Sequence, residues 1–155
     1  MKKVSNSDVT VVIATLNEEK GIGPTLGELR EVLEENSDVG MVLGNRFNDS
    51  FDLKAMGNAY YFGNSFLAFK QYLLNGVKLR DPLTGLRVVR WDILRDWKPK
   101  AKSFDVEAEL NHYVERKGYR IKEIPIHYRE RLEEKKLKLR HGVTILRRIL
   151  AESFS

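Results

Sequence analysis

The sequence predicts an α/β fold in which helices flank a mostly parallel sheet. Two apolar runs, Val9–Ala14 and Val39–Leu43, are typical of strands buried on both faces of such a sheet. Leucines and valines at helical spacing lie between them, so the chain opens with a β-α-β unit. A polar loop follows the first run, at the edge of the sheet where ligands bind in open α/β folds.

Pro24 is placed to open the first helix, which the apolar spacing extends to about Glu35. A long helix is expected from Ala55 to Asn75, although its glycines weaken the prediction. Aromatic residues fall on more than one face of this helix. They indicate either core packing or a helix that lies against lipid with its tyrosine rings at the interface.

An Asp-Pro turn closed by Gly85 separates the long helix from the later elements. Asp105 and Gly118 are placed as the N-cap and C-cap of one of the later helices. The expected elements are a strand at Leu86–Val89, one or two helical turns at Trp91–Trp97, a helix at Val106–Lys117, a strand at Tyr119–Ile126 and an amphipathic helix at Thr144–Phe154. No linker composition interrupts residues 1–155, which are predicted to form a single domain.

The composition indicates a globular protein with one core. The 155 residues exclude two domains of ordinary size. The absence of cysteine excludes disulfides and thiolate metal sites and fits the reducing cytoplasm. No apolar run reaches the roughly 20 residues of a spanning helix, so we expect a cytoplasmic protein that does not cross a membrane by itself. Abundant lysine and glutamate are typical of thermophilic organisms, archaea included, whereas the number of asparagines argues against this.

The net charge of +5 arises from basic residues concentrated within residues 129–155. Such a segment attracts phosphate on a nucleotide, a nucleic acid or a lipid head group. A solvated charged face, with glutamates between the basic residues, explains the same pattern. Nucleic-acid binding is the weakest interpretation, because no groove-reading motif is present and aromatic residues do not alternate with the basic ones.

Five segments carry a more specific signal through their order along the chain. They are Val9–Glu19 with its Asn-Glu loop, Val42–Phe47 with Gly-Asn-Arg-Phe, the Arg-Asp-Pro-x-x-Gly-Leu-Arg turn at Arg80–Arg87, Phe104–Glu109, and Gly118–Arg129. Together they resemble glycosyltransferase family 2, most closely the dolichol-phosphate mannosyltransferases and related polyprenyl-phosphate glycosyltransferases. The resemblance covers nearly all of the chain and implies a GT-A-like, Rossmann-like fold.

The resemblance implies an inverting transfer of a hexose from a nucleotide sugar to a polyprenyl (dolichyl) phosphate, with peripheral contact on the cytoplasmic membrane face. It also implies a Mg²⁺ or Mn²⁺ ion on the diphosphate of the donor. Two segments that hold the donor in this family, Asp-Asp-x-Ser and Asp-x-Asp, are absent from the chain. The fold is therefore predicted to be truncated, with the central donor-binding segment missing at a junction within residues 28–35.

The resemblance also assigns roles to single residues. Asn17 and Glu18 match the loop that contacts the nucleotide, and a polar turn at a strand end is an equal alternative. Asp81 is the catalytic candidate, as a group that positions the acceptor, because a phosphate acceptor needs no strong base. Its structural alternative is a side chain that caps the turn. Four arginines are candidates to grip phosphate with their guanidinium forks: Arg46, Arg80, Arg87 and Arg129.

Asp105, Glu107 and Glu109 are the remaining candidates to ligate a metal ion. On a helix, successive members of this set point about 200° apart and cannot converge. We therefore predict that these acids cap the helix, are exposed or bond to neighbours, and that they do not ligate a metal ion. The histidines lack the spacing of metal ligands.

Two hypotheses follow from the matching and missing segments. The chain is either a glycosyltransferase of this type or a non-catalytic, internally deleted remnant that acts only as a folded or oligomeric module. A sheet without its central strands exposes edges that can pair two chains, so a homodimer is conceivable.

Overall fold

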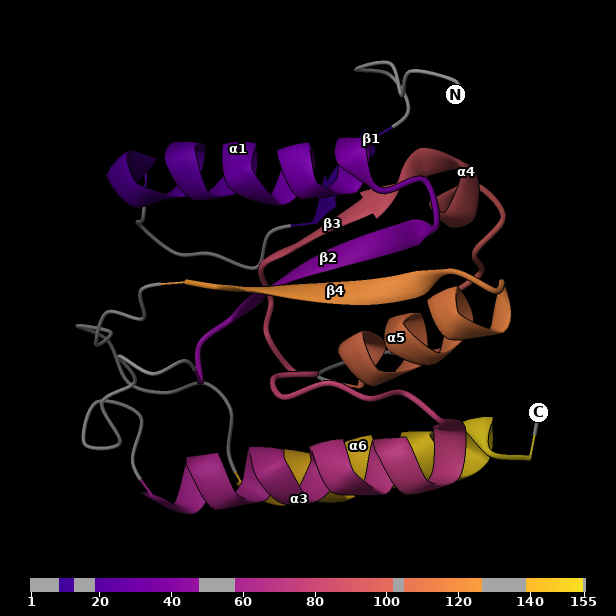
Figure 1. Ribbon diagram of the computed structural model, residues 1–155. Coiled ribbons are helices and arrows are strands. Elements are labelled where there is room, and N and C mark those ends of the chain that lie inside the picture. Colours follow the sequence, from indigo (N-terminus) through magenta and orange to yellow (C-terminus); the bar gives the residue numbers. More distant parts are fainter. Residues whose placement is uncertain (1–8, 13–18, 48–57, 102–104, 127–138, 155) are drawn as a thin grey trace.

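The computed structural model describes residues 9–12, 19–47, 58–101, 105–126 and 139–154. Its elements lie in successive layers, which are helix α1 (Glu19–Glu35), a sheet, helix α5 (Val106–Arg116) and an outer pair of helices, α3 (Asn58–Asn75) and α6 (Leu139–Glu152) (Figure 1). The strand order in the sheet is β1 (Val9–Val12), β3 (Arg87–Arg90), β2 (Val39–Asn45) and β4 (Arg120–Pro125). A short helix, α4 (Trp91–Leu94), follows β3 directly. The predicted α/β class is confirmed.

The sheet is mixed, whereas the sequence predicted a mostly parallel one. β2 and β4 pair in parallel, but β3 is antiparallel to both of its neighbours, β1 and β2. After α3 the chain returns to the end of the sheet at which β2 stops, and there the Gly44 N–H donates to the Leu86 carbonyl at 3.0 Å. A strand that starts where its neighbour ends runs in the opposite direction. A pattern of apolar residues does not reveal this direction.

The side chains of β2 alternate between two cores, so the burial on both faces that was predicted for Val39–Leu43 is confirmed. One core lies between the sheet and α5 and includes Met41, Leu43, Val89, Leu110 and Val114. The other lies under α1 and consists of Leu29, Leu33, Val39, Val42 and Val88. A third cluster joins the outer helices to α5 through Leu67, Ala108, Ile145 and Ile149.

The expected helices are present with shifted ends. α1 begins at Glu19, so Pro24 lies inside the helix rather than at its start. Pro24 has no N–H to donate to the carbonyl four residues earlier, so the first turns of α1 contain one hydrogen bond fewer. The predicted junction at residues 28–35 lies within α1, which is continuous there. Gly118, with φ +80°, ends α5 as predicted.

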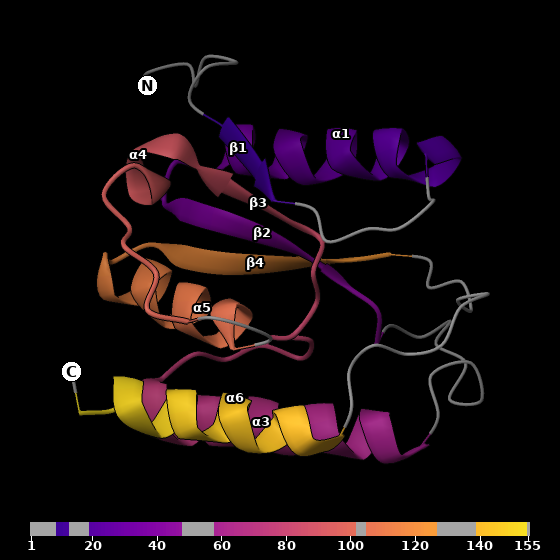
Figure 2. The same cartoon turned by 180° about the vertical axis from the view of Figure 1, so that it is seen from behind.

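The outer helices α3 and α6 lie side by side, on the far side of α5 from the sheet (Figure 2). Polar side chains of α3 bond both to α5 and to the neighbouring helix α6 of the same layer. The Gln71 amide donates to the Ala108 carbonyl of α5 at 2.9 Å, and the Asn75 amide donates to the Ile149 carbonyl of α6 at 3.2 Å. None of the helices in the described part of the chain is both long and apolar enough to cross a bilayer.

Candidate functional site

The Arg-Asp-Pro turn lies between the sheet and α3, near the ends of β2 and β4. Asp81 is fully buried in this turn. Its carboxylate accepts hydrogen bonds from Nε and Nη2 of Arg46, at 2.6 and 2.7 Å, and from the Arg46 backbone N–H at 3.1 Å. Two predicted site residues, from separate segments of the sequence, therefore form one ion pair. Because both Asp81 oxygens accept from Arg46, the side chain ties the turn to the end of β2.

Glu123 of β4 holds the same turn from the other side, and it is not among the site residues predicted from the sequence. Its carboxylate accepts hydrogen bonds from the backbone N–H groups of Arg80 and Asp81, at 2.9 and 2.8 Å. Strand periodicity contained the signal, since Ile121 packs on the core and the residue two positions later faces the same side. Burial raises the pKa of Glu123, and this effect outweighs the two backbone hydrogen bonds that favour the ionised form.

Arg87 was predicted to grip phosphate, and the structure contradicts this role. Its side chain is buried on β3 and donates to the Asn111 side chain at 3.2 Å, to the Pro82 carbonyl at 3.4 Å and to the Thr84 carbonyl. Burial lowers the pKa of Arg87 to about 10, which leaves the side chain charged at neutral pH. The guanidinium thus stabilises the turn from inside. Its planar fork can donate to backbone carbonyl oxygens as well as to the oxygens of a phosphate.

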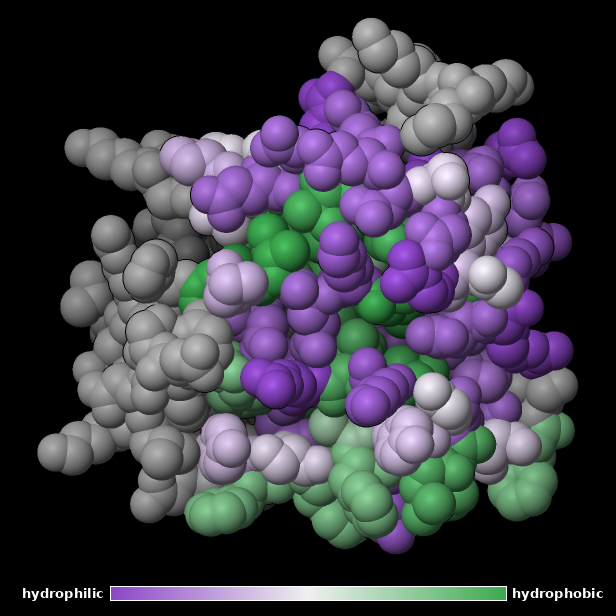
Figure 3. All heavy atoms as spheres, viewed as in Figure 1, coloured by the Kyte–Doolittle hydropathy of each residue, from purple (hydrophilic) through white to green (hydrophobic). Residues whose placement is uncertain are grey.

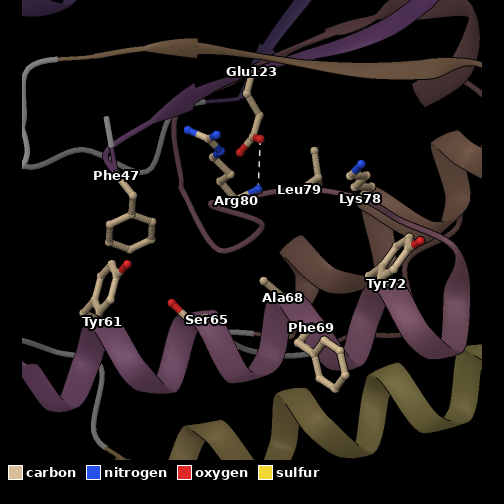
Figure 4. A pocket seen from close by; sticks show the side chains of 10 residues that line it. All are labelled: Phe47, Tyr61, Ser65, Ala68, Phe69, Tyr72, Lys78, Leu79, Arg80 and Glu123. Atoms are coloured by element: carbon tan, nitrogen blue, oxygen red, sulfur yellow. Dashed lines mark hydrogen bonds between the residues drawn. The ribbon is translucent and has the colours of Figure 1, made fainter. Parts of the chain in front are cut away.

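A pocket of about 610 Å³ opens between the turn and α3 (Figure 4). Two cationic side chains, Lys78 and Arg80, lie on its sheet side together with Glu123. The opposite side is formed mainly by α3. The aromatic residues that line the pocket are Phe47, Tyr61, Phe69 and Tyr72. The pocket therefore combines two cationic side chains at one wall with four aromatic residues in its lining, and Arg80 is the predicted phosphate-binding residue that reaches it.

The three acidic residues at the start of α5 do not converge on a metal site. Asp105 occupies the predicted N-cap position, but its side chain accepts a hydrogen bond from Nε of Arg148 at 3.1 Å instead of capping the helix. Glu109 is buried and accepts from the backbone N–H groups of Lys100 and Ala101, at 2.7 and 2.5 Å. Oε2 of Glu107 is buried without a hydrogen-bond partner in the described structure. Asp105 and Glu109 both lie near Nε of the Arg148 guanidinium, at 3.1 and 3.7 Å, and Glu109 is also engaged by two backbone N–H groups, so the set does not fit a Mg²⁺ or Mn²⁺ ion.

The described residues contain no group of three histidine or acidic side chains that could hold a metal ion. Three further residues that the sequence analysis selected, Asn17, Glu18 and Arg129, lie outside the described residues. The described part of the candidate site therefore consists of Arg46 and Asp81, with Arg80 beside the pocket.

No family model matches the chain. A search of curated proteins found an uncharacterized protein of Methanocaldococcus jannaschii that is 31% identical over 100 residues. The match covers 63% of this chain and 40% of that protein. The chain thus spans well under two thirds of this relative, whose name carries no activity.

Replacement of Glu123 by Gln is expected to change how stability depends on pH. The buried carboxyl binds its proton more tightly in the folded chain than in the unfolded one. The stability it contributes is therefore full below its ordinary pKa of 4.5 and is lost as the pH rises above that value. The variant lacks this pH dependence. Its unfolding free energy should also be lower by about 1 to 2 kcal/mol, because its amide N–H group faces a backbone donor.

Urea unfolding of both proteins between pH 4 and pH 7 measures the effect of Glu123 as the difference in unfolding free energy. As the pH rises, this difference should shift in favour of the Gln variant. A difference that is constant with pH would contradict the expectation. Glu28→Gln, which removes an exposed carboxyl on α1, controls for the loss of one negative charge.

Proposed function

We propose that the chain has a GT-A-like fold, truncated in its donor-binding part, and serves in the transfer of a hexose from a nucleotide sugar to a polyprenyl phosphate. The resemblance of the five segments to glycosyltransferase family 2 is the starting point. The Arg46–Asp81 ion pair supports the proposal, because it joins two of these segments in one place. The pocket beside them supports the acceptor side of the reaction.

The composition of the pocket is the observation that carries the proposal. A polyprenyl phosphate is an anion attached to a long apolar chain. Lys78 and Arg80 can neutralise and hydrogen-bond the phosphate, while the aromatic lining accepts the isoprenoid units next to it. Glu123 lies at the same wall, and its carboxylate oxygens are engaged by the backbone N–H groups of Arg80 and Asp81.

In the proposed reaction, a phosphate oxygen of the acceptor forms a bond to the anomeric carbon of the hexose, and the bond from that carbon to the nucleoside diphosphate breaks. The attacking oxygen is already anionic, so no proton has to be removed. Asp81 then acts through Arg46 and through the backbone of the turn, by fixing where Arg80 lies. The metal ion that the resemblance implies has no matching ligand set among the described residues.

Transfer is tested with radiolabelled GDP-mannose or UDP-glucose, Mn²⁺ and undecaprenyl phosphate in detergent. We expect label in the organic phase after extraction, and a lower rate for Arg80→Gln. Arg120→Gln is the matched control, since Arg120 is an exposed arginine of β4 that pairs with Asp38 away from the pocket. Absence of label from the organic phase with both nucleotide sugars would refute catalysis by this chain.

A non-catalytic module is the second candidate. It is favoured because the carboxylates at the start of α5 do not form a set that fits a metal ion. This module would keep the acceptor pocket and lack donor binding. Isothermal titration with farnesyl phosphate separates the two candidates. Binding that Arg80→Gln weakens by about tenfold, together with no transfer and no thermal stabilisation by a nucleotide sugar, would support the module and overturn the transferase.

A further inference from the structure

Two cationic side chains in the wall of the pocket, Lys78 and Arg80, have no partner within the described structure. Neither forms a side-chain hydrogen bond or an ion pair with another described residue. By contrast, the guanidinium groups of Arg46, Arg87 and Arg90 are bonded inside the fold. The two pocket cations therefore remain available to an anion that enters the pocket.

Lys78 and Arg80 lie on the same side of an extended segment. Burial alternates along this segment, because Val77, Leu79 and Asp81 are buried while the two cations between them are exposed. In an extended chain every second side chain points the same way and lies about 6.5 Å further along. Figure 4 accordingly shows Lys78 and Arg80 on either side of Leu79. The cations thus form two adjacent anion positions along the wall.

The two positions differ in their charged surroundings. Glu123 is the only acid among the described residues that line the pocket, and it lies beside Arg80, whose backbone N–H donates to its carboxylate at 2.9 Å. One phosphate group contacts both cations only if the two long side chains turn towards each other. A ligand with two linked phosphates can contact both where they lie, with the second phosphate at Lys78 and away from Glu123.

The wall opposite the cations is formed mainly by α3, which contributes Ala68, Phe69 and Tyr72 to the lining. On the surface of the molecule, hydrophobic residues gather at the lower edge, over α3, and polar residues dominate the described surface above it (Figure 3). The pocket volume of about 610 Å³ is within the range of about 300 to 1,000 Å³ that is typical of small-ligand sites. A matching ligand therefore joins an anionic end to a short apolar segment.

We infer that the pocket binds prenyl diphosphates, with one phosphate at Arg80, the other at Lys78, and the first isoprenoid units along α3. Charge-assisted hydrogen bonds to both phosphates make this ligand bind more tightly than the corresponding monophosphate. Because the same pocket is the proposed acceptor site, this assignment rests on the proposed function. It adds regulation to that function, since a prenyl diphosphate that occupies the pocket excludes the acceptor and inhibits transfer by competition. A nucleoside diphosphate is a poorer ligand, because its polar ribose would meet the aromatic lining.

Isothermal titration without divalent metal ions tests the inference. The ligands are farnesyl diphosphate, farnesyl phosphate, inorganic diphosphate and GDP. We expect farnesyl diphosphate to bind about tenfold more tightly than farnesyl phosphate, because it forms a second set of charge-assisted hydrogen bonds. Inorganic diphosphate and GDP should bind at least about tenfold more weakly than farnesyl diphosphate, because they lack the apolar chain.

Lys78→Gln separates the two phosphate positions. It should weaken farnesyl diphosphate binding about tenfold and farnesyl phosphate binding by about threefold or less, whereas Arg80→Gln should weaken the binding of both ligands. Lys98→Gln is the matched control, since Lys98 is an exposed lysine that does not line the pocket, and its binding should equal that of the wild type. All three changed side chains are exposed, so melting temperatures should stay close to the wild-type value.

Equal affinity of the wild type for the two farnesyl ligands would overturn the inference and leave the acceptor role in place. An equal loss of both ligands in Lys78→Gln would also overturn it, as would tightest binding by GDP or inorganic diphosphate. Binding of farnesyl diphosphate without any binding of farnesyl phosphate would instead refute the acceptor role and support the diphosphate site. None of these results depends on transfer activity.

Discussion

Arg87→Met is expected to destabilise the protein by about 3 to 5 kcal/mol. The guanidinium of Arg87 satisfies two backbone carbonyls, those of Pro82 and Thr84, and the oxygen of the Asn111 side chain. Methionine fills a similar volume but leaves these buried acceptors without donors. Replacing a buried charge together with its partners by apolar residues often stabilises a protein. Here the partners include backbone carbonyls, which no substitution removes, so that stabilisation does not arise.

Chemical denaturation of the variant measures this loss. Arg87→Lys keeps the charge, but one ammonium group cannot reach all three acceptors, so its unfolding free energy should lie between those of the wild type and Arg87→Met. Arg120→Met is the matched control on another strand, where the arginine is exposed and its removal should change little. Wild-type stability in Arg87→Met would mean that the turn does not depend on the buried fork.

Arg87 also shows where prediction from the sequence fails. The motif placed it among phosphate-binding arginines, yet it belongs to a strand in which every residue is buried. Arg90 on the same strand is buried too, and it donates to the carbonyls of Leu33, Asn36 and Val39. A short strand with arginine at both ends suggests exposed ends. In the structure, backbone carbonyls of α1, of the segment that leads into β2, of β2 itself and of the turn satisfy these side chains. Such partners become visible only when distant segments are assembled.

The elements of the fold were easier to predict than their arrangement. Apolar spacing and end signals such as Gly118 are local, and they located β2 and α5 to within about two residues, whereas α6 begins at Leu139 rather than at the predicted Thr144. Strand direction depends on where the chain returns after α3, which no local pattern encodes. In the candidate site, the Arg46–Asp81 pair joins two predicted residues, whereas Glu123 and Lys78 were missed because their roles arise from contacts between segments.

Asp81→Asn is expected to cost about 3 to 5 kcal/mol, because it removes one partner of a buried ion pair. The new amide group can accept from only one of the two Arg46 nitrogens, and its own N–H₂ faces the other. Arg46 loses its hydrogen-bonded carboxylate, and the turn loses its link to the end of β2. Thermal and urea unfolding measure the loss. Asp96→Asn, which changes an aspartate that pairs with an arginine on the surface, should leave stability nearly unchanged.

A double-mutant cycle separates the Arg46–Asp81 interaction from other effects of the substitutions. If the ion pair accounts for the cost, Arg46→Met and Asp81→Asn together should destabilise the protein by less than the sum of the single changes. The same variants should bind farnesyl phosphate more weakly when folded, since the turn that carries Arg80 is no longer held at Asp81. Additive losses of stability would show that Arg46 and Asp81 act independently, and unchanged farnesyl phosphate binding would show that Arg80 does not depend on their pairing. The stability cycle thus tests the ion pair, and the binding measurement tests its connection to the pocket.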